Sequence, residues 1–284
     1  MMKEAYKLAN GVEIPKLGLG TWFIDDSKVS DAICEAVKLG YRHVDTAQAY
    51  GNERGVGEGI RRCSLKRGEI FVTTKLAAEI KTYAEAVAAI NESLEKMDIG
   101  YIDLMLIHAP QPWADFRGGD YAQGNREAWR ALEDAYKAGK LRAIGVSNFK
   151  EEDMENILSS CEIAPMVNQL LVHVSNTPLS LIEYCQNKGI IVEAYSPVAH
   201  GAILNNPEIV NMAAKYGVTA ARLCIRYCLQ LGTLPLPKTA NPAHMEENAQ
   251  VDFVISGQDM ETLKAFKHIE NYGEFSVFPV FSGK

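Results

Sequence analysis

The sequence predicts an α/β fold in which eight parallel strands close into a (β/α)8 barrel. Eight short apolar runs alternate with longer amphipathic stretches, a pattern typical of parallel strands joined by helical crossovers. The chain has 284 residues, 47% of them hydrophobic, which suits one barrel and makes residues 1–284 a single predicted domain. The predicted strands are residues 16–21, 42–46, 69–75, 102–108, 143–148, 165–170, 190–196 and 233–238.

The stretches between these runs have the periodicity of amphipathic helices. Thr82 and Glu85 have the spacing of a capping box at the start of one of them. Two predicted apolar faces consist of Val29, Ile33, Ala36 and Val37, and of Val87, Ile90, Leu94 and Met97. Several helices are predicted to end at a glycine, which readily takes the left-handed conformation found there. These glycines are Gly40, Gly139, Gly189 and Gly217.

Two segments lie outside the eight repeats. Residues 6–15 place Asn10–Gly11 between two short alternating runs, which predicts a β-hairpin with a type I′ turn. We expect this N-terminal hairpin to cap the bottom of the barrel. The last fifteen residues are rich in aromatic and turn-forming residues, and we expect them to form a C-terminal tail over the top.

A doubly wound open sheet is the alternative fold. It requires a glycine-rich fingerprint after its first strand, and the sequence GLGTWF at 18–23 lacks the third glycine. Gly55, Gly57 and Gly59 lie within a helical stretch, where close packing against a neighbour is the simpler interpretation. The sequence therefore favours the closed barrel.

Composition and charge argue against several function classes. The net charge of −7 is spread along the chain, whereas nucleic-acid binding needs clustered Lys and Arg. No apolar run approaches the roughly 18 residues of a membrane span, and the start MMKEAYKLANG is too polar for a signal peptide. We expect a cytoplasmic protein without nucleic-acid or membrane partners, and a monomer because no long exposed apolar patch is evident.

The cysteines do not predict a metal site. None of the six belongs to a CxxC pair, and Cys224 and Cys228 share a helix face without further ligands nearby. Buried, reduced thiols are the expected state, since free Cys packs as a small hydrophobic residue. We predict no metal.

Polar residues gather at the C-terminal ends of the predicted strands, where barrels of this kind have their active sites. Asp45, Lys75 and His108 end three successive strands, and Tyr50 lies in the loop after the first of them. A helix cap or a structural ion pair would explain any one of these residues, but packing alone does not explain all four. The other strands end at Ser147–Asn148, Asn168–Gln169, Tyr195–Ser196 and Lys238.

These four side chains suit proton donation to a carbonyl oxygen. A phenol has a pKa of about 10, and the ammonium of Lys75 is expected to lower the pKa of Tyr50. Asp45 would hold Lys75 charged, and His108 would orient the oxygen. The G-x-S-x-G motif of acyl transfer is absent. Protonation of that oxygen fits hydride transfer to the carbonyl carbon, which requires a cofactor, usually a nicotinamide.

The chain resembles the aldo-keto reductases along nearly its whole length. The motifs that carry the resemblance are GLGTW (18–22), HVDTAQAYGNERGVGEGI (43–60), TTK (73–75), LMLIHAP (104–110), GKLRAIGVSNF (139–149), NQL (168–170), EAYSP (193–197) and LPKTANPAHMEEN (236–248). The bacterial members that reduce 2,5-diketogluconate or methylglyoxal are the most similar in these motifs. The resemblance implies an NADP-dependent enzyme that reduces small carbonyl substrates.

The resemblance implies a role for each matching residue. Asp45, Tyr50, Lys75 and His108 would form a catalytic tetrad in which Tyr50 is the general acid. The nicotinamide carboxamide would bind Ser147, Asn148 and Gln169, and its ring would stack on Tyr195. The remaining NADP contacts would be Gly20, Thr21, Asp45, Ser196, Pro197, Val198, Gly201, Lys238, Thr239, His244, Glu247 and Asn248. The substrate pocket would contain Trp22, Tyr50, His108 and Trp113, with Phe275 and Phe278 from the tail.

The sequence departs from the family pattern at two positions. The residue after the catalytic histidine is often Trp in the family and is Ala109 here, so we expect Trp113 to supply the missing wall. The Arg that usually binds the 2′-phosphate of NADP is replaced by His244. We therefore expect NADPH to be preferred, with some use of NADH.

Two alternative functions share this fold. A non-catalytic cofactor-binding or structural protein is one, since fold alone does not establish turnover, but it would not need the complete tetrad. A barrel enzyme for a phosphorylated substrate is the other. It would have a glycine-rich phosphate site after the last two strands, where this chain has Pro237–Lys238–Thr239.

Overall fold

A sheet of eight parallel strands forms the centre of the structure, a computed structural model that describes residues 2–282. Strands that follow one another along the chain are neighbours in the sheet. The strands are β3 (Leu19–Gly20), β4 (His43–Asp45), β5 (Phe71–Leu76), β6 (Ile102–Ile107), β7 (Leu141–Ser147), β8 (Val167–Leu171), β9 (Ile191–Tyr195) and β10 (Leu234–Leu236). Each predicted strand therefore overlaps an observed one, and the observed strands are mostly shorter.

The sheet closes on itself between its first and last strands. Gly20 and Lys238 form a parallel bridge. The backbone N–H of Gly18 donates to the carbonyl of Pro235 at 3.2 Å, and that of Gly20 to the carbonyl of Pro237 at 3.1 Å. The predicted (β/α)8 barrel is thus confirmed, and the open doubly wound sheet is excluded.

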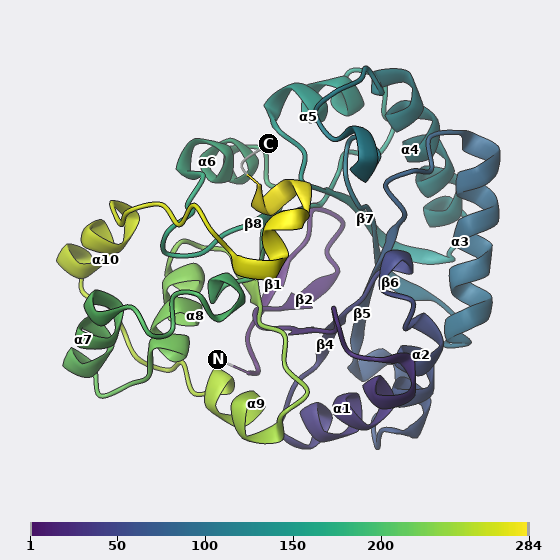
Figure 1. The fold of residues 1–284 in the computed structure, drawn as a ribbon. Helices are drawn as coiled ribbons and strands as arrows, with labels where there is room; N and C mark the ends of the chain where they lie inside the picture. The colour runs from purple at the N-terminus through teal and green to yellow at the C-terminus, as the bar shows by residue number, and fades with distance from the viewer. Residues whose placement is uncertain (1, 283–284) are drawn as a thin grey trace.

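Helices surround the barrel (Figure 1). Their bounds are α1 (Asp26–Lys38), α2 (Glu53–Arg62), α3 (Tyr83–Met97), α4 (Ala122–Lys137), α5 (Glu151–Leu158), α6 (Leu179–Asn187), α7 (Pro207–Lys215), α8 (Ala220–Gln230), α9 (Pro242–Ala249) and α10 (Gly257–Lys264). Short 3-10 helices are η1 (Gln48–Tyr50), η2 (Arg67–Glu69), η3 (Trp113–Asp115), η4 (Ala199–Gly201), η5 (Gly273–Val277) and η6 (Pro279–Phe281).

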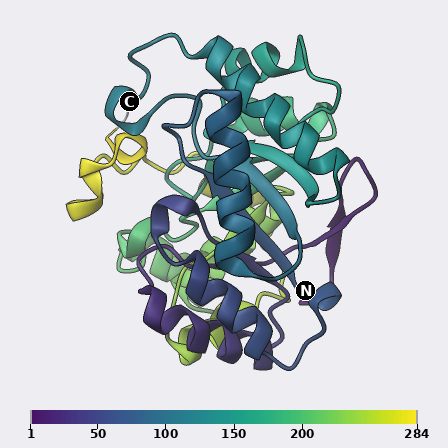
Figure 2. The same cartoon turned by 90° about the vertical axis from the view of Figure 1, so that its right-hand side faces the viewer.

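The N-terminal hairpin and the C-terminal segment lie at opposite ends of the barrel. Figure 2 shows the purple hairpin on one side of the molecule and the yellow C-terminal segment on the other. The hairpin consists of β1 (Ala5–Lys7) and β2 (Glu13–Pro15), paired antiparallel. The predicted cap and tail are therefore both present.

The predicted type I′ turn of the hairpin is wrong. A type I′ turn needs positive φ at both central residues, whereas Gly11 has a φ of 87° and Asn10 is absent from the positive-φ residues. The N–H of Gly11 donates to the carbonyl of Leu8, and the N–H of Leu8 to the carbonyl of Val12, both at 2.8 Å. This is the pattern of a three-residue loop with glycine at the bulge position.

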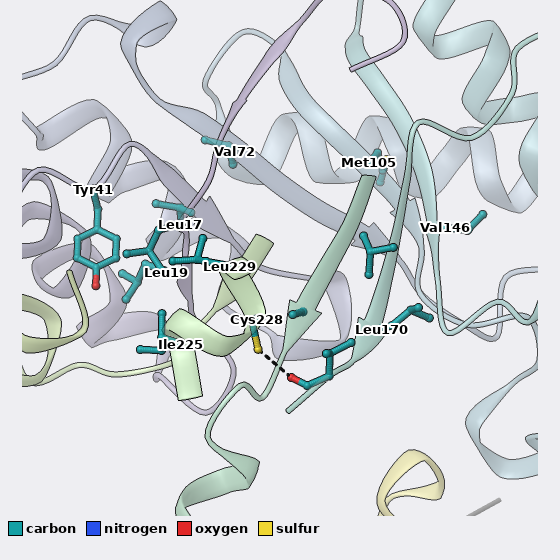
Figure 3. Close-up of a cluster of buried hydrophobic side chains, with 14 of the residues drawn as sticks. Leu17, Leu19, Tyr41, Val72, Met105, Val146, Leu170, Ile225, Cys228 and Leu229 are labelled. Carbon is teal, nitrogen blue, oxygen red and sulfur yellow. Dashed lines mark hydrogen bonds between the residues drawn. The ribbon is translucent and has the colours of Figure 1, made fainter. Parts of the chain in front are cut away.

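Apolar side chains fill both sides of the sheet. The outer core lies between strands and helices, and Figure 3 shows part of it, with Leu17, Tyr41, Met105 and Ile225 among the labelled residues. The inner core lies at the hairpin end of the barrel, where Leu8 and Ile14 of the hairpin join residues of the strands. Side chains alternate between the two sides of a strand. The inward positions that continue toward the other end are polar.

Glycines determine how closely α2 packs against its neighbours. A Cβ at Gly57 would lie 1.9 Å from the carbonyl oxygen of Met97, and one at Gly55 would lie 2.1 Å from that of Asp26. Both contacts are with backbone of α1 or α3, so only glycine fits here. The interpretation of these glycines as packing residues is confirmed.

The helix ends follow the sequence signals. The Thr82 side chain accepts a hydrogen bond from the N–H of Glu85 at 3.3 Å, which caps α3. The predicted helix-ending glycines all have positive φ; these are Gly40, Gly139, Gly189 and Gly217. All six cysteines lie within the described residues and are free thiols, but three of them are partly exposed rather than buried. Among residues 2–282, no helix is long and apolar enough to cross a membrane.

Candidate active site

The ammonium of Lys75 is the centre of the site and has no exposed surface. Its Nζ donates to Asp45 Oδ1 at 2.8 Å, to Asp45 Oδ2 at 2.7 Å and to the backbone carbonyl of Thr46 at 2.8 Å. The hydroxyl oxygen of Tyr50 lies 3.2 Å from the same nitrogen. Asp45 ends β4, and Tyr50 ends η1, which follows it. The folded chain thus brings the predicted carboxylate, ammonium and phenol into direct contact.

Burial has the largest effect on the pKa values of Tyr50 and Lys75. It raises the pKa of Tyr50 above the usual 10.0, and Lys75 offsets this only in part. The expected effect of Lys75, which lowers the pKa of Tyr50, is therefore present, but the desolvation of the buried phenol outweighs it. Burial also disfavours the ammonium, but Asp45 and Tyr50 outweigh it, so that the pKa of Lys75 is raised. Tyr50 therefore carries its proton at neutral pH, and Lys75 is charged.

His108 faces Tyr50 from the end of β6. The ring centroids lie 5.7 Å apart at an angle of 74°. Burial and the charge of Lys75 lower the pKa of His108 well below 6.5, so its imidazole is neutral. The indole of Trp113 packs edge-on against His108 at 5.2 Å, while Ala109 is fully buried. Trp113 therefore stands beside His108, as expected from the small residue at position 109.

Amide and hydroxyl groups from β7, β8 and β9 adjoin the tetrad. Ser147 Oγ donates to the backbone carbonyl of Gln169 at 2.9 Å, and Asn148 Nδ2 donates to the backbone carbonyl of His108 at 3.1 Å. The hydroxyl of Tyr195 donates to Asn148 Oδ1 at 2.8 Å. Asn148 has a φ of 61°, a conformation that Asn tolerates better than most residues. These bonds place donors, acceptors and an aromatic ring together at the rim.

The loop after β9 has unusual backbone conformations. Ser196, Ala199 and His200 have φ values of 52°, 50° and 53°, and Gly201 has 89°. Positive φ at non-glycine residues is uncommon and costs free energy, and such residues cluster at ligand sites. Pro197 and Val198 lie between them, and Ser196 Oγ is 3.1 Å from His200 Nε2. The backbone of this predicted cofactor segment is therefore held in a strained shape.

The predicted adenosine-binding residues follow the last strand of the barrel. Lys238 is exposed and Thr239 is buried directly after β10. The other three lie on α9 at the periphery of the barrel (Figure 1). His244 is exposed, Glu247 is partly exposed and Asn248 is buried. The positive end of the helix dipole lies at the start of α9, so this region offers positive charge from two sources.

The end of the first barrel strand lies between the tetrad and the predicted adenosine-binding residues that follow β10. A Cβ at Gly20 would lie 3.1 Å from the backbone oxygen of Leu236 and 3.4 Å from Cβ of Lys238. Thr21 Oγ1 donates to the backbone carbonyl of Asp45 at 2.9 Å. Gly20 and Thr21 are thus in contact with β10 on one side and with the tetrad on the other.

Aromatic rings from the C-terminal segment and Trp22 cluster beside the tetrad. Trp22 lies 6.2 Å from the Tyr50 ring, 6.0 Å from Phe275 and 5.1 Å from Phe278. The ring of Phe281 is stacked with Trp22 at 6.2 Å and is buried. A cavity of about 530 Å³ beside this C-terminal segment is lined in part by Asn148, Tyr195 and Phe281. The tail therefore covers the site, and Phe281 packs as a core residue.

Two buried residues next to the tetrad have no role predicted from the sequence. Glu193 and His43 have no exposed surface. Gln169 Nε2 donates to Asp45 Oδ1 at 2.9 Å and to Glu193 Oε2 at 2.7 Å. His43 Nε2 is 2.9 Å from Thr73 Oγ1 and 3.7 Å from Glu193 Oε1. A carboxylate in the middle of the apolar run 190–196 is the signal that could have identified Glu193.

Comparisons with known proteins agree with this geometry. A sequence model of the Aldo/keto reductase family matches residues 16–268. The chain is 39% identical over 274 residues to glyoxal reductase of Bacillus subtilis (strain 168), covering 96% of each chain. It is 36% identical to 9,11-endoperoxide prostaglandin H2 reductase of Trypanosoma cruzi, covering 94% of this chain and 92% of that one. The crystal structure of Bombyx mori aldo-keto reductase in complex with NADP superposes with a TM-score of 0.86 at 31% identity, covering 98% of both chains.

Proposed function

We propose that this chain, which belongs to the aldo/keto reductase family, reduces aldehydes and ketones to alcohols with NADPH, and that Tyr50 donates the proton. The observation that carries the proposal is the buried chain of contacts from Asp45 through Lys75 to the Tyr50 hydroxyl. A non-catalytic protein would have no reason to retain a charged pair of this kind at the mouth of a barrel, since buried ion pairs rarely add stability.

The side chains present fit a nicotinamide dinucleotide. Ser147, Asn148 and Gln169 supply the hydroxyl and amide groups that a carboxamide can pair with, and Tyr195 supplies an aromatic ring beside them. Lys238 and the start of α9 supply positive charge for phosphates. When bound, NADPH supplies the hydride.

The protein's own contribution is the proton and its orientation. As negative charge develops on the carbonyl oxygen, the Tyr50 O–H bond breaks and its proton passes to that oxygen. The charged Lys75 stabilises the phenolate that results, and Asp45 keeps Lys75 in place. Neutral His108 donates a hydrogen bond to the same oxygen and orients it. General acid catalysis of this kind contributes about 10² to 10⁴ in rate.

The preference for NADPH over NADH depends on the few groups that can contact the 2′-phosphate. Lys238 provides a point charge and Thr239 a hydroxyl, while His244 replaces a guanidinium that would bind a phosphate through two donors. We therefore propose a preference for NADPH with measurable use of NADH. His244→Arg should tighten NADPH binding and leave NADH binding nearly unchanged, with gains of about tenfold if one charged hydrogen bond is restored. Equal NADPH dissociation constants for both proteins in isothermal titration would mean that His244 does not face the phosphate.

Small, reactive carbonyl compounds are the proposed substrates. The rings of Trp22 and Trp113 contact Tyr50 and His108, and the rings of Phe275 and Phe278 contact Trp22, so the surface beside the proton donor is mostly apolar. Such a surface selects weakly among aldehydes and ketones. The similarity to a glyoxal reductase makes glyoxal and methylglyoxal the first compounds to test. A cytoplasmic location and a monomeric state stay predictions.

A substrate panel tests the proposal. The oxidation of NADPH and of NADH should be followed by absorbance with glyoxal, methylglyoxal, aromatic aldehydes and simple ketones. We expect turnover of several aldehydes, faster with NADPH than with NADH. A protein that binds NADPH but turns over none of the panel would support the non-catalytic alternative.

A further inference from the structure

The Gln169 amide bridges two buried carboxyl groups, that of Asp45 in the tetrad and that of Glu193 next to it. Its Nε2 donates to Asp45 Oδ1 at 2.9 Å and to Glu193 Oε2 at 2.7 Å. An amide nitrogen has two hydrogens, so both are used. The backbone register explains the proximity, because Gln169 on β8 is paired directly with Glu193 on β9. The only polar atom of the amide left to contact a ligand is Oε1.

The ionised Asp45 sets the direction of this amide. Asp45 is bound to the ammonium of Lys75 and can only accept hydrogen bonds. Reversing the amide would bring its carbonyl oxygen against that carboxylate. Glu193 supplies the second acceptor for Nε2, without which one buried N–H of Gln169 would lack a partner, an arrangement that costs free energy.

The surroundings of Glu193 favour its neutral form. Burial, with the charge of Asp45 in addition, raises the pKa of Glu193 to about 8. The charge of Lys75 is already compensated by Asp45. Burial together with Lys75 lowers the pKa of His43 to about 3, so His43 is neutral and offers Glu193 no positive charge. On β10, the residue paired with Glu193 is the apolar Leu234. The titratable groups that face Glu193 are thus His43 and Asp45 from β4, Lys75 from β5 and Tyr50 from η1.

We propose that Glu193 is a positioning residue that acts through Gln169, holding the amide oxygen toward the cofactor's carboxamide nitrogen and leaving Asp45 as the single negative charge beside Lys75. This inference rests on the proposed NADPH site. Glu193 touches neither of the reacting groups. Its effect passes through the two hydrogen bonds of Gln169 Nε2.

The pH dependence of the reaction follows from the same arrangement. When Glu193 loses its proton as the pH rises through about 8, a second negative charge appears near Tyr50 and raises the pKa of the phenol further. Tyr50 then becomes a weaker acid. As the pH rises from about 7 to about 9, kcat of the wild type should therefore fall more steeply than kcat of Glu193→Gln, whose residue 193 stays neutral.

Two substitutions separate the hydrogen bond that Glu193 accepts from the charge that it can carry. Glu193→Gln keeps an oxygen that accepts from Gln169, whereas Glu193→Leu removes it. The dissociation constant of NADPH, measured by quenching of protein fluorescence in the full-length protein, should be about tenfold larger for Glu193→Leu than for Glu193→Gln. In a Gln169→Leu background, the same two substitutions should differ by less than about twofold, because the residue through which Glu193 acts is gone.

Several results would overturn the proposal. These are equal affinities of the two variants in the presence of Gln169, a difference that persists without Gln169, or identical kcat–pH profiles for the wild type and Glu193→Gln. Should Glu193→Leu fail to fold, the comparison of these two pH profiles decides alone. The affinity measurements need no turnover, so a wild type that binds NADPH without reducing any carbonyl would refute the proposed function while the affinities still test Glu193.

Discussion

The Lys75 ammonium has four oxygen partners within 3.2 Å: both Asp45 carboxylate oxygens, the Thr46 carbonyl and the Tyr50 hydroxyl. At the scale of single residues, this contact set links stability to catalysis. Asp45 is 4% exposed, so its charge depends on Lys75 for compensation. Tyr50 depends on the same ammonium, which offsets part of the increase in its pKa on burial.

Lys75→Met should therefore reduce both the stability of the protein and its rate of catalysis. Removing one partner of a buried ion pair costs about 3–5 kcal/mol, and the pKa of Tyr50 should rise further without the ammonium. We expect a lower melting temperature and a large loss of kcat. Lys96→Met is the matched control, because Lys96 pairs with Glu92 at the surface, where such pairs contribute about 0–1 kcal/mol. An active Lys75→Met protein with the wild-type pH–rate profile would refute the tuning role of Lys75.

At the scale of elements, the close approach of α2 to α1 and α3 supports the segment that carries Tyr50. The helix begins at Glu53, three residues after Tyr50, and Asn52 Nδ2 donates to the backbone carbonyls of Thr21 and Ile24 at 3.0 Å each. The glycines of α2 allow this helix to lie against backbone on both sides. The position of the phenol thus depends on a packing contact far from any reacting atom.

Gly57→Ala tests whether packing or helix propensity dominates in α2. Propensity alone would make alanine more stable by about 1 kcal/mol, but its Cβ would lie 1.9 Å from the Met97 carbonyl, and overpacking typically costs about 1–3 kcal/mol. We expect a net loss of stability in urea unfolding. At Gly68, a Cβ would meet nothing within 4 Å, so Gly68→Ala should be nearly neutral. Equal midpoints for the two variants would show that α2 can shift without cost.

At the scale of the whole molecule, the sequence predicted the barrel, its strands and the residues at their C-terminal ends. These follow from local patterns: apolar runs, helix caps and a polar residue at the end of each strand. The net pKa change of Tyr50, the turn at Asn10–Gly11 and the bond between Gln169 and Glu193 could not be predicted in this way. The pKa of Tyr50 depends on how deeply the phenol is buried, and the Gln169–Glu193 bond depends on which side chains meet between neighbouring strands, so neither is local in the sequence. The turn differs because Leu8 and Val12 close a loop of three residues, a length that the Asn-Gly pair does not set by itself.

The C-terminal segment is predicted to select substrates. Deleting residues 274–284 removes Phe275 and Phe278 from the Trp22 cluster, so KM should change unequally among substrates while NADPH still binds; residues 283 and 284 lie outside the described residues. Within this segment, Val277 is 80% exposed, whereas Phe281 is 3% exposed and packs in the core. We therefore expect Phe281→Ala to lower the melting temperature more than Phe278→Ala does. For the deletion, unchanged KM values would refute the role of this segment in substrate selection.

Tyr50→Phe is the sharpest test of whether Tyr50 supplies the proton, because the substitution keeps the ring and removes only the hydroxyl. The measurement is kcat for reduction of the best aldehyde, with the NADPH dissociation constant determined on the same preparation. We predict a loss of about 10² or more in kcat and a nearly unchanged dissociation constant. A variant that binds NADPH normally and keeps most of the wild-type kcat would show that Tyr50 is not the proton donor.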